Sequence, residues 1–369
     1  MQINAKQTTA RLLLPVMLFG YGVFANVDIR PQLLGAVSQL PANLGQLSHG
    51  LIGTTLEAVY KTELPHREFA VEFVGAARYV LFGEGRHGVV VGKNGWLFSE
   101  EEFRGAANAN ANADSGISRG VREISKVAEA LRSRGQRLIV VPLPAKSDVY
   151  REYLTDQRYA SIAERRYADF IDAMSAAQID VVDAREALLR AKPQENVFLK
   201  TDTHWTPAGA KAVAGAIAAS SRIVGQTHFV LKDEPNRALE GDLVKFVTGA
   251  RLAPSIGLKN EVVAPQTASP DDAGSIIDIL GQDETFPVVL VGTSYSANDT
   301  WSFSAYLEAA LGANVLNVAE IGRGPVVPMR KFLETSQQIQ GQPTVLWEFP
   351  VRYLTEPALW DAPPPVVEE

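Results

Sequence analysis

Ser294 has the residue type and the sequence position of a catalytic nucleophile. It follows the apolar segment FPVVLVG at 286–292, which is typical of a buried strand, and Gly292 lets the chain turn sharply. Catalytic groups of open α/β sheets lie beyond the carboxyl ends of the strands, and backbone N–H groups at a helix start are suited to hold an oxyanion. Strand-Gly-x-Ser also occurs as a plain turn, so the segment alone leaves both interpretations open.

His204 is the candidate base for this serine, because a serine hydroxyl becomes a nucleophile only when its proton is removed. Asp202, two positions earlier, can accept the other imidazole N–H and fix the tautomer. Residues i and i+2 point the same way only in extended backbone, which is expected before a helix that starts at Thr206 and Pro207. Alternatively, Asp202 satisfies loop amides and His204 is a hydrogen-bonded core residue.

A metal site is the weaker interpretation of the Asp202 and His204 pair. Zinc needs three or four ligands, commonly His or Cys at short spacing, whereas the chain has no Cys and only five His. The absence of Cys also excludes disulfides and thiolate catalysis. A net charge of −7 offers no basic surface to nucleic acid. We therefore expect no metal, no cofactor and no nucleic-acid partner.

The segments around these residues alternate between helices and short apolar strands. We expect strands at 136–144, 179–183, 286–292, 314–318 and 344–349, and helices at 117–134, 158–177, 207–221, 301–312 and 328–339. Short, continuously apolar strands separated by helices predict an α/β fold in which a mostly parallel sheet is flanked by helices. In addition, 89–103 reads as a hairpin around an Asn-Gly turn. We expect 105–116 to be a mobile loop and 222–285 to be irregular.

The N-terminal segment is typical of an exported protein. Lys6 and Arg11 precede an apolar run of 14 residues at 12–25, which fits a signal-peptide core of about 7–15 residues better than a spanning helix of about 20. We expect 1–25 to be a signal peptide or a signal-anchor, with a buried N-terminal helix as the alternative. We expect one domain over 26–356 and a disordered tail over 357–369.

Several motifs together resemble the alginate O-acetyltransferase family AlgJ/AlgX. The two main ones are KTDTHWTPAGA at 200–210 and VVLVGTSYS at 288–296; GKNGWLF at 92–98, VVPLPAKSDVY at 140–150 and WEFPVRYL at 347–354 resemble family segments in the same order. The resemblance spans about 90–354. It implies an SGNH hydrolase-like fold with a circularly permuted motif order, in which the Asp-x-His pair precedes the serine. It also implies that Ser294 is the nucleophile, His204 the base and Asp202 the orienting acid.

The resemblance further implies a function and partners. It implies transfer of acetyl groups to an exopolysaccharide, foremost the mannuronate residues of alginate, through an acetyl-serine intermediate. The expected place is the periplasm, in association with the inner membrane. A membrane-bound O-acyltransferase is the implied acetyl donor, and other secretion-complex proteins are implied partners. About fifteen residues follow 347–354, too few for the carbohydrate-binding module of AlgX-type proteins, so we expect a chain closer to the AlgJ type.

Alternatives to this function stay open at the level of the sequence. The acceptor polymer can be cellulose, and the same triad with water as acceptor is a carbohydrate acetylesterase. A non-catalytic scaffold that presents the polymer is the third possibility.

Four further side chains are candidates for contacts near the reacting groups. Trp205 can stack on a sugar ring or wall the core, and we favour the core. Tyr295 can touch the acyl group or pack, and Trp301 is a further aromatic of this kind. Arg352 has a guanidinium fork that suits a uronate carboxylate, although we favour a surface salt bridge for it.

Overall fold

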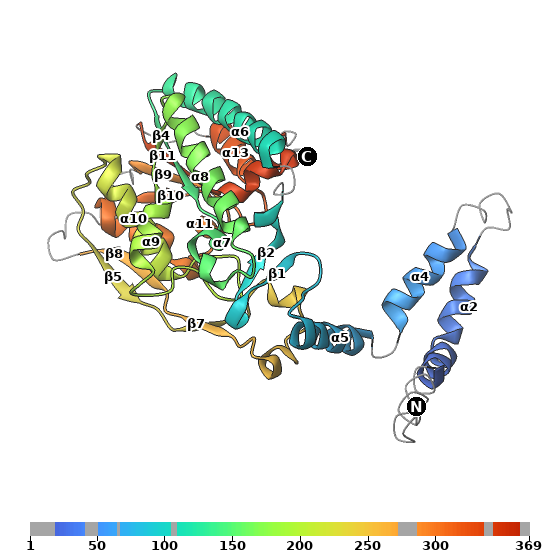
Figure 1. Cartoon of the computed structure of the whole chain (residues 1–369). Coiled ribbons are helices and arrows are strands. Elements are labelled where there is room, and N and C mark those ends of the chain that lie inside the picture. The colour runs from blue at the N-terminus through green and yellow to red at the C-terminus, as the bar shows by residue number, and fades with distance from the viewer. Residues whose placement is uncertain are drawn as a thin grey trace, which may run out of the picture. The chain divides into compact units, whose positions relative to one another are not determined.

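The computed structural model describes residues 19–40, 51–64, 67–104, 109–271, 286–335 and 342–361. The chain divides into two units, residues 1–74 and 75–369. In the first unit, residues 19–28 are helical, and α2 (Arg30–Ser38) and α4 (Leu51–Glu63) pack against each other (Figure 1). The helix α5 (Arg67–Phe82) crosses the boundary between the units. Residues 26–74, which we included in the single predicted domain, therefore belong to the first unit.

The predicted export segment falls mostly on residues 1–18, which lie outside the described residues. A signal peptide or signal-anchor over 1–25 therefore stays a prediction. In the part of the chain that the structure describes, none of the helices combines the length and the apolar character needed to cross a membrane.

The second unit is built around a sheet of five strands. They are β3 (Arg137–Leu143), β4 (Asp180–Val181), β9 (Val288–Val291), β10 (Val315–Asn317) and β11 (Thr344–Pro350). Their order is β10-β9-β11-β3-β4, and all neighbouring strands are parallel. Each of the five predicted strands is present, which confirms the predicted α/β fold. Strand β9, which precedes Ser294, is a direct neighbour of β11.

Helices cover both faces of this sheet (Figure 1). On one face lie α6 (Ala109–Arg132), α8 (Arg158–Ala176) and α13 (Val326–Thr335); on the other lie α9 (Ala184–Ala191), α10 (Pro207–Ser221) and α12 (Phe303–Leu311). Side chains of β3 alternate between the two cores. Ile139 and Val141 lie in the core with α9, α10 and α12, whereas Leu138 and Val140 lie in the core with α6, α8 and α13. Burial on both sides explains why the strands are continuous apolar runs.

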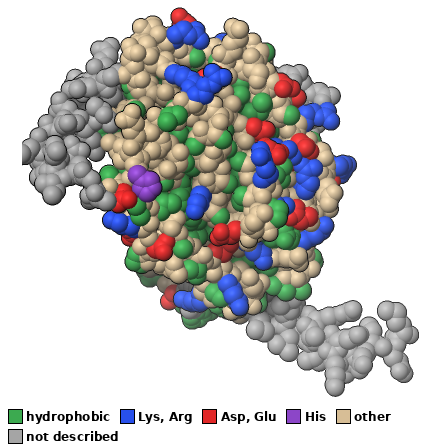
Figure 2. All heavy atoms as spheres, turned by 90° about the vertical axis from the view of Figure 1, so that its left-hand side faces the viewer, with side chains coloured by type: hydrophobic (Ala, Val, Ile, Leu, Met, Phe, Trp, Pro, Cys, Tyr) green, Lys and Arg blue, Asp and Glu red, His purple; other side chains and the backbone are tan. Residues whose placement is uncertain are grey.

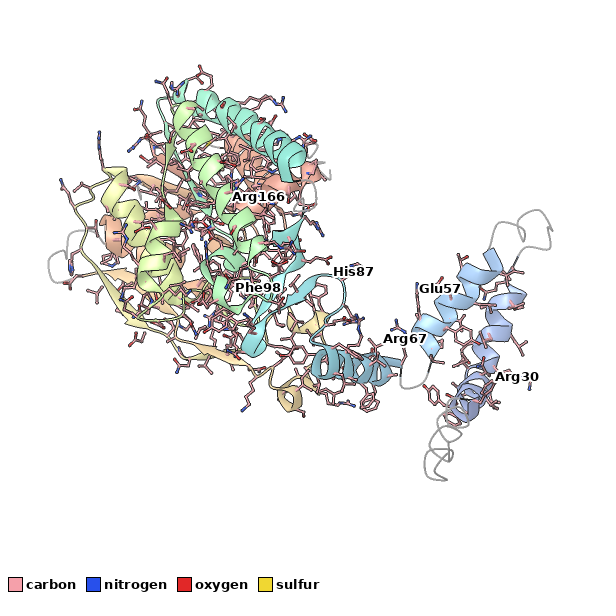
Figure 3. The ribbon with its side chains drawn as sticks, viewed as in Figure 1. Arg30, Glu57, Arg67, His87, Phe98 and Arg166 are labelled. Carbon is pink, nitrogen blue, oxygen red and sulfur yellow. The ribbon has the colours of Figure 1, made fainter. Side chains whose placement is uncertain are left out.

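The predicted hairpin at 89–103 is present. Its strands β1 (Val89–Val91) and β2 (Leu97–Ser99) pair antiparallel. Asn94 and Gly95 both have positive φ, 56° and 74°, which explains why an Asn-Gly pair stands at this turn. Phe98 of β2 is completely buried, whereas His87, in the loop before β1, is exposed (Figure 3). The hairpin thus joins the core on one side and leaves a polar loop on the other.

Three predictions of local structure differ from the structure. The helix α6 begins at Ala109, so the predicted loop at 105–116 is wrong from 109 onward. Alanine is the strongest helix former, and the alanines of this segment favour a helix although Asn residues, which are weak helix formers, stand between them. The segment 222–271 is not wholly irregular, because it contains two antiparallel strand pairs. These are β5 (Phe229–Asp233) with β8 (Gln266–Pro270), and β6 (Arg237–Leu239) with β7 (Glu261–Val263).

The third difference concerns the predicted disordered tail over 357–369. Its first residues form the short helix α14 (Pro357–Trp360), and Trp360 is buried against the rings of Trp347 and Phe349. Burial of an indole ring removes a large apolar surface from water, which holds this segment in place. Residues 362–369 lie outside the described residues.

The surface agrees with the low net charge. On the face drawn in Figure 2, Lys and Arg side chains are interspersed with Asp and Glu. That face therefore carries no continuous basic patch of the kind that binds nucleic acid.

Candidate active site

His204 joins Asp202 and Ser294 through its two ring nitrogens. Its Nδ1 lies 2.6 Å from Asp202 Oδ1, and its Nε2 lies 2.8 Å from Ser294 Oγ. Both distances fall within the reach of about 2.6–3.2 Å that proton transfer requires. With Nδ1–H donating to the carboxylate, Nε2 is left to accept the serine O–H. The geometry predicted from the sequence is therefore present, although 90 residues separate the serine from the histidine.

Ser294 is the first residue of a short helical turn at the end of β9. This turn, α11 (Ser294–Ala297), is capped by Thr293, whose side chain accepts a hydrogen bond from the Tyr295 N–H. Thr293, and not Ser294, is therefore the residue that caps this turn. The Ser294 hydroxyl instead points to the imidazole at the carboxyl edge of the parallel sheet, which is where open α/β folds place their ligands.

The loop before α10 presents Asp202 and His204 together. Phe198 and Trp205 form a β-bridge across it, and Thr206 caps α10 by accepting from the Gly209 N–H, as predicted. Asp202 Oδ1 also accepts the backbone N–H of His204 at 2.8 Å. The carboxylate is therefore both a loop cap and the partner of the imidazole, so the two interpretations of Asp202 hold at the same time.

Asp202 is ionised in this setting. Burial by itself would raise the pKa of its carboxyl group, but the hydrogen bond and charge of His204 act the other way. Backbone N–H groups of Asp242 and His204 also donate to it, at 2.9 and 2.8 Å. Together they hold the pKa of Asp202 below its usual value. A negative charge here suits a group that stabilises an imidazolium.

Asp242 completes a cluster of three potential metal ligands with Asp202 and His204. Each of their ligand atoms is already engaged in the structure. Asp242 accepts the N–H and the O–H of Thr203 at 2.8 and 2.6 Å, while the atoms of Asp202 and His204 make the bonds described above. The hydrogen bonds thus account for the cluster without a cation, and the donor set fits a proton relay better than a zinc site.

Aromatic rings enclose the imidazole. Trp301 stacks on His204 with ring centroids 5.2 Å apart and an interplanar angle of 20°, and Tyr295 lies against another side at 4.8 Å. Trp205 is completely buried, and its Nε1 donates to the carbonyl oxygen of Tyr295 at 3.1 Å. A substrate-binding role for Trp205 is therefore wrong, because no sugar ring can reach it. The packing interpretation holds.

Tyr295 is buried as well, so the packing interpretation also holds for this residue and its proposed substrate contact is not supported. Its hydroxyl donates to the carbonyl oxygen of Thr203 and accepts from Arg352 Nη1 at 3.0 Å. Burial raises the pKa of Tyr295 well above its usual value, so the phenol stays neutral. Its role is to join the serine turn to the histidine loop.

Arg352 does form a salt bridge, but not a surface one. Its Nε lies 3.1 Å from Glu101 Oε2, and its side chain is only 7% exposed. The surface interpretation is therefore wrong, because the segment after β11 folds this side chain inward against Tyr295. Arg352 nevertheless lines the same cavity as Ser294 and His204. A fixed positive charge thus faces the space where a substrate would lie.

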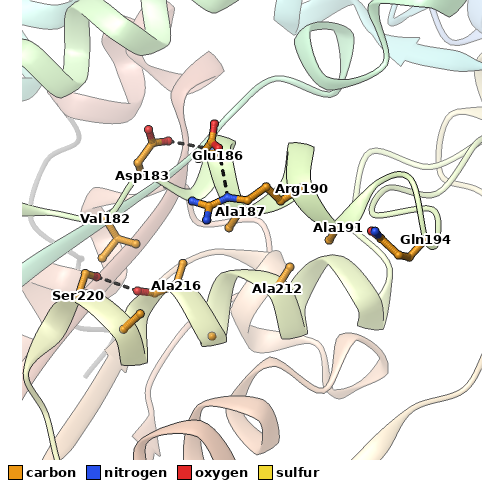
Figure 4. A pocket seen from close by; sticks show the side chains of 12 residues that line it. Val182, Asp183, Glu186, Ala187, Arg190, Ala191, Gln194, Ala212, Ala216 and Ser220 are labelled. Carbon is orange, nitrogen blue, oxygen red and sulfur yellow. Dashed lines mark hydrogen bonds and ion pairs between the residues drawn. The ribbon is translucent and has the colours of Figure 1, made fainter.

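That cavity has a volume of about 600 Å³ and is open to solvent. Besides Ser294, His204 and Arg352, its lining includes the charged residues Glu100, Glu101, Arg104, Asp242 and Lys245. A larger cavity of about 850 Å³ lies between α9 and α10 (Figure 4). It is lined mainly by small side chains and by the Glu186–Arg190 ion pair, and it contains none of the predicted site residues.

Two buried charged side chains near the site were not predicted. Lys146, in α7 (Lys146–Val149), donates to the carbonyl oxygens of Lys200 and Asp202 at 3.1 and 2.8 Å, and burial lowers its pKa to about 8. Glu348, in β11, accepts hydrogen bonds from the serine turn. A charged residue inside an otherwise apolar segment, such as the Glu of TVLWEF, is a sequence signal that could have found Glu348.

Comparisons with known proteins agree on one family. A family model described as "SGNH hydrolase-like domain, acetyltransferase AlgX" matches residues 89–351. The chain is 36% identical over 337 residues to "Probable alginate O-acetylase AlgJ" from Azotobacter vinelandii, which covers 87% of this chain and 84% of that protein. It is 26% identical over 336 residues to "Alginate biosynthesis protein AlgX" from Pseudomonas putida, which covers 87% and 68% respectively.

A solved structure supports the same assignment. The "O-Acetyltransferase Domain of Pseudomonas putida AlgJ" matches with a TM-score of 0.64 and 34% identity, covering 75% of this chain and 100% of that chain. The predicted SGNH hydrolase-like fold is therefore confirmed, and so is the greater similarity to AlgJ than to AlgX. This chain belongs to the AlgJ/AlgX family of SGNH hydrolase-like acetyltransferases.

Proposed function

We propose that this protein transfers acetyl groups to alginate through an acetyl-serine intermediate on Ser294. The observation that carries the proposal is the hydrogen bond of 2.8 Å between His204 Nε2 and Ser294 Oγ, with Asp202 on the far side of the imidazole. This arrangement supports nucleophilic acyl transfer, because the base is in contact with both the nucleophile and its orienting carboxylate.

The first half of the reaction acylates the enzyme. His204 Nε2 takes the proton of the Ser294 hydroxyl while Oγ attacks the carbonyl carbon of an acetyl ester. The bond from that carbon to the leaving group then breaks, and the leaving group departs with the proton held by His204. Ser294 begins the helical turn α11, so its own N–H has no acceptor within the turn. We assign this N–H to the oxyanion, where one donor contributes about 3–4 kcal/mol.

The second half transfers the acetyl group to the polymer. A sugar hydroxyl gives its proton to His204 and its oxygen attacks the acetyl carbonyl. The bond to Ser294 Oγ breaks, and the serine recovers its proton from the histidine. Arg352 in the same cavity supports a uronate acceptor, because a guanidinium pairs with a carboxylate. The relatives named as probable alginate O-acetylases support alginate, and we propose its mannuronate residues as the acceptors.

The setting of the reaction is also a proposal. The basic and apolar N-terminal segment supports export to the periplasm and association with the inner membrane. An activated acetyl group must then reach the site from the membrane, for which we propose a membrane-bound O-acyltransferase as the donor. Other proteins of the secretion complex would deliver the polymer.

The decisive experiment detects the intermediate. The purified protein is incubated with p-nitrophenyl acetate, and peptides are analysed by mass spectrometry for one acetyl group on Ser294. Ser294→Ala should fold normally and carry no acetyl group in this peptide. Ser304→Ala serves as a matched control, because this half-buried serine lies in the nearby helix α12 and takes no part in the hydrogen bonds of His204.

The acceptor is tested in the same assay. Oligomannuronate, oligoguluronate and a neutral cello-oligosaccharide are added in turn, and the acetyl group is traced to sugar or to free acetate. Transfer to oligomannuronate supports the proposal, transfer to the cello-oligosaccharide replaces the polymer by cellulose, and release as acetate alone makes the protein an esterase. A Ser294→Ala variant that retains transfer would exclude Ser294 as the nucleophile.

A further inference from the structure

Glu348 places a carboxyl group at the central strand of the sheet, and the residue has no exposed surface. It lies on β11, whose residue Trp347 is paired in register with Val291 of β9. Glu348 follows Trp347 on β11, and Gly292 follows Val291 directly after the end of β9, so the carboxyl group lies beside the point where the chain leaves β9. We call residues 292–296 the nucleophile turn, because Ser294 is at its centre.

Three groups of the nucleophile turn donate hydrogen bonds to Glu348. Oε2 accepts the Thr293 N–H at 2.9 Å and the Ser296 hydroxyl at 2.8 Å, and the Thr293 hydroxyl donates to Oε1 at 3.1 Å. These donors stand on both sides of Ser294 in the sequence. The carboxyl group therefore fixes the turn before and after the nucleophile, while it makes no contact with the serine hydroxyl itself.

Gly292 makes this close approach possible. A Cβ atom at this position would lie 2.5 Å from Glu348 Oε2 and 2.9 Å from Ser296 Oγ. Gly292 is not among the residues with positive φ, so the requirement for glycine here is steric and does not come from the backbone conformation. In the sequence Gly-Thr-Ser-Tyr-Ser, the glycine thus leaves space for the buried carboxyl group, and Thr293 and Ser296 supply the two hydroxyl groups that donate to it.

Loss of solvation opposes the burial of this carboxyl group. Burial raises the pKa of Glu348, with the Thr293 N–H and the two hydroxyl groups only partly offsetting the effect. An apolar side chain of similar volume would avoid that desolvation, but it would leave the Thr293 N–H and the hydroxyl groups of Thr293 and Ser296 without this acceptor. A buried carboxyl group that accepts three hydrogen bonds from the nucleophile turn is expected to serve the site that this turn presents.

We propose that Glu348 is a positioning residue, which holds the nucleophile turn so that Ser294 Oγ stays within hydrogen-bond reach of His204 Nε2. The inference rests on the proposed function, in which Ser294 is the nucleophile. Catalysis depends steeply on such placement, because a displacement of about 1 Å can lower a rate about 10²-fold. The effect of losing Glu348 is thus expected in kcat and in the reactivity of Ser294, with KM for the acetyl donor nearly unchanged.

The experiment compares Glu348→Gln and Glu348→Ala with the full-length wild type. Four quantities are measured. Turnover of p-nitrophenyl acetate gives kcat and KM, and phenylmethylsulfonyl fluoride gives the fraction of molecules that react and the rate constant for sulfonylation of Ser294. We expect kcat and the sulfonylation rate constant per reactive molecule to fall together, about tenfold for Gln and about 10²-fold for Ala. Asp148→Asn is the matched control, since Asp148 is an equally buried carboxylate that pairs with Arg151 and Arg185. It should lower stability and leave the rate per reactive molecule unchanged.

A double-mutant cycle adds a readout that a purely structural role would not move. Ser296→Ala removes one of the donors to Glu348, so its effect on kcat should be largely absent when Glu348 is already Ala, which has no acceptor left. Gly292→Ala should reproduce the loss seen in Glu348→Ala, because its Cβ displaces the carboxyl group. If Glu348→Ala does not fold, Glu348→Gln and Gly292→Ala provide the same test.

The outcomes separate this inference from the proposed function. If fewer Glu348→Gln molecules react, but each reacts at the wild-type rate, then Glu348 is only structural and the inference is overturned. Wild-type kcat in both Glu348 variants, together with an inactive Ser294→Ala, overturns the inference and leaves the function standing. An active Ser294→Ala overturns the function itself.

Discussion

The ammonium group of Lys146 donates a hydrogen bond to the carbonyl oxygen of Asp202 at 2.8 Å, although 56 residues separate the two in the sequence. The same group donates to the carbonyl oxygen of Lys200 and lies 5.4 Å from the ring centroids of Trp96 and Phe98. A buried lysine therefore holds the loop that presents Asp202 and His204. It does so in an environment where its charge is poorly solvated.

This burial predicts a pH dependence of stability. The pKa of Lys146 is lowered to about 8 from its usual 10.5, so between these values the unfolded chain binds more protons than the folded one. The free energy of unfolding should therefore rise with pH in this window, by roughly 3 kcal/mol at most. Urea unfolding of the wild type and of Lys146→Met from pH 7 to 11 measures the difference.

The exposed Lys232→Met variant is the control for this experiment. Its stability should follow the wild type across the whole pH range. Parallel curves for the wild type and Lys146→Met would show that Lys146 does not release its proton in this window.

Asp202→Asn tests the relay itself. The amide cannot accept the Nδ1–H of His204 as a carboxylate does, and it favours the wrong tautomer, a change that lowers kcat about 10⁴-fold in serine hydrolase triads. We expect a similarly large loss in acetyl turnover with an unchanged fold by circular dichroism. Asp242→Asn is the comparison, because Asp242 clamps the same loop through Thr203 without touching the imidazole. Equal losses in the two variants would argue that Asp202 only shapes the loop.

The sequence predicts best what depends on local patterns. Ser294 at a strand end follows from a run of β-branched residues and a glycine, and the start of α10 follows from the N-cap Thr206 and Pro207. The strands within 222–271 were missed because they are short and partly exposed and so lack a clear period.

The residues that support the site depend on tertiary contacts and have weaker local signals. Asp242 lies in a segment without regular structure, and nothing in its neighbours indicates that it accepts from Thr203. Arg352 was expected at the surface, because a lone arginine usually stays in water. Its burial follows only from the fold of the segment after β11 against Tyr295.

Two substitutions of Trp301, to Phe and to Ala, should lower kcat to different extents. Its ring stacks on His204, and its Nε1 has no hydrogen-bond partner among the described residues, so Trp301→Phe removes a part of the ring but no hydrogen bond to a described residue. Trp301→Ala opens a cavity beside the imidazole and should lower stability by about 3–5 kcal/mol. We expect kcat to fall less than about tenfold in Trp301→Phe and far more in Trp301→Ala, per folded molecule. Equal kcat values would show that the ring does not orient His204.

Substitution of Arg352 should weaken binding of the acceptor polymer without changing the reaction with the acetyl donor. Its guanidinium bonds Glu101 and Tyr295 and faces the cavity that holds Ser294. Arg352→Lys keeps the positive charge but loses the planar fork, and a hydrogen bond between charged groups contributes about 1.5–3 kcal/mol. We therefore expect KM for oligomannuronate to rise about ten- to hundredfold, while turnover of p-nitrophenyl acetate changes less than about threefold. A neutral hydroxyl acceptor, glycerol, should show no change in its rate of acetylation. If turnover of p-nitrophenyl acetate falls as much as the acetylation of oligomannuronate, Arg352 acts by fixing Tyr295 and the nucleophile turn. The uronate must then be recognised elsewhere in the cavity.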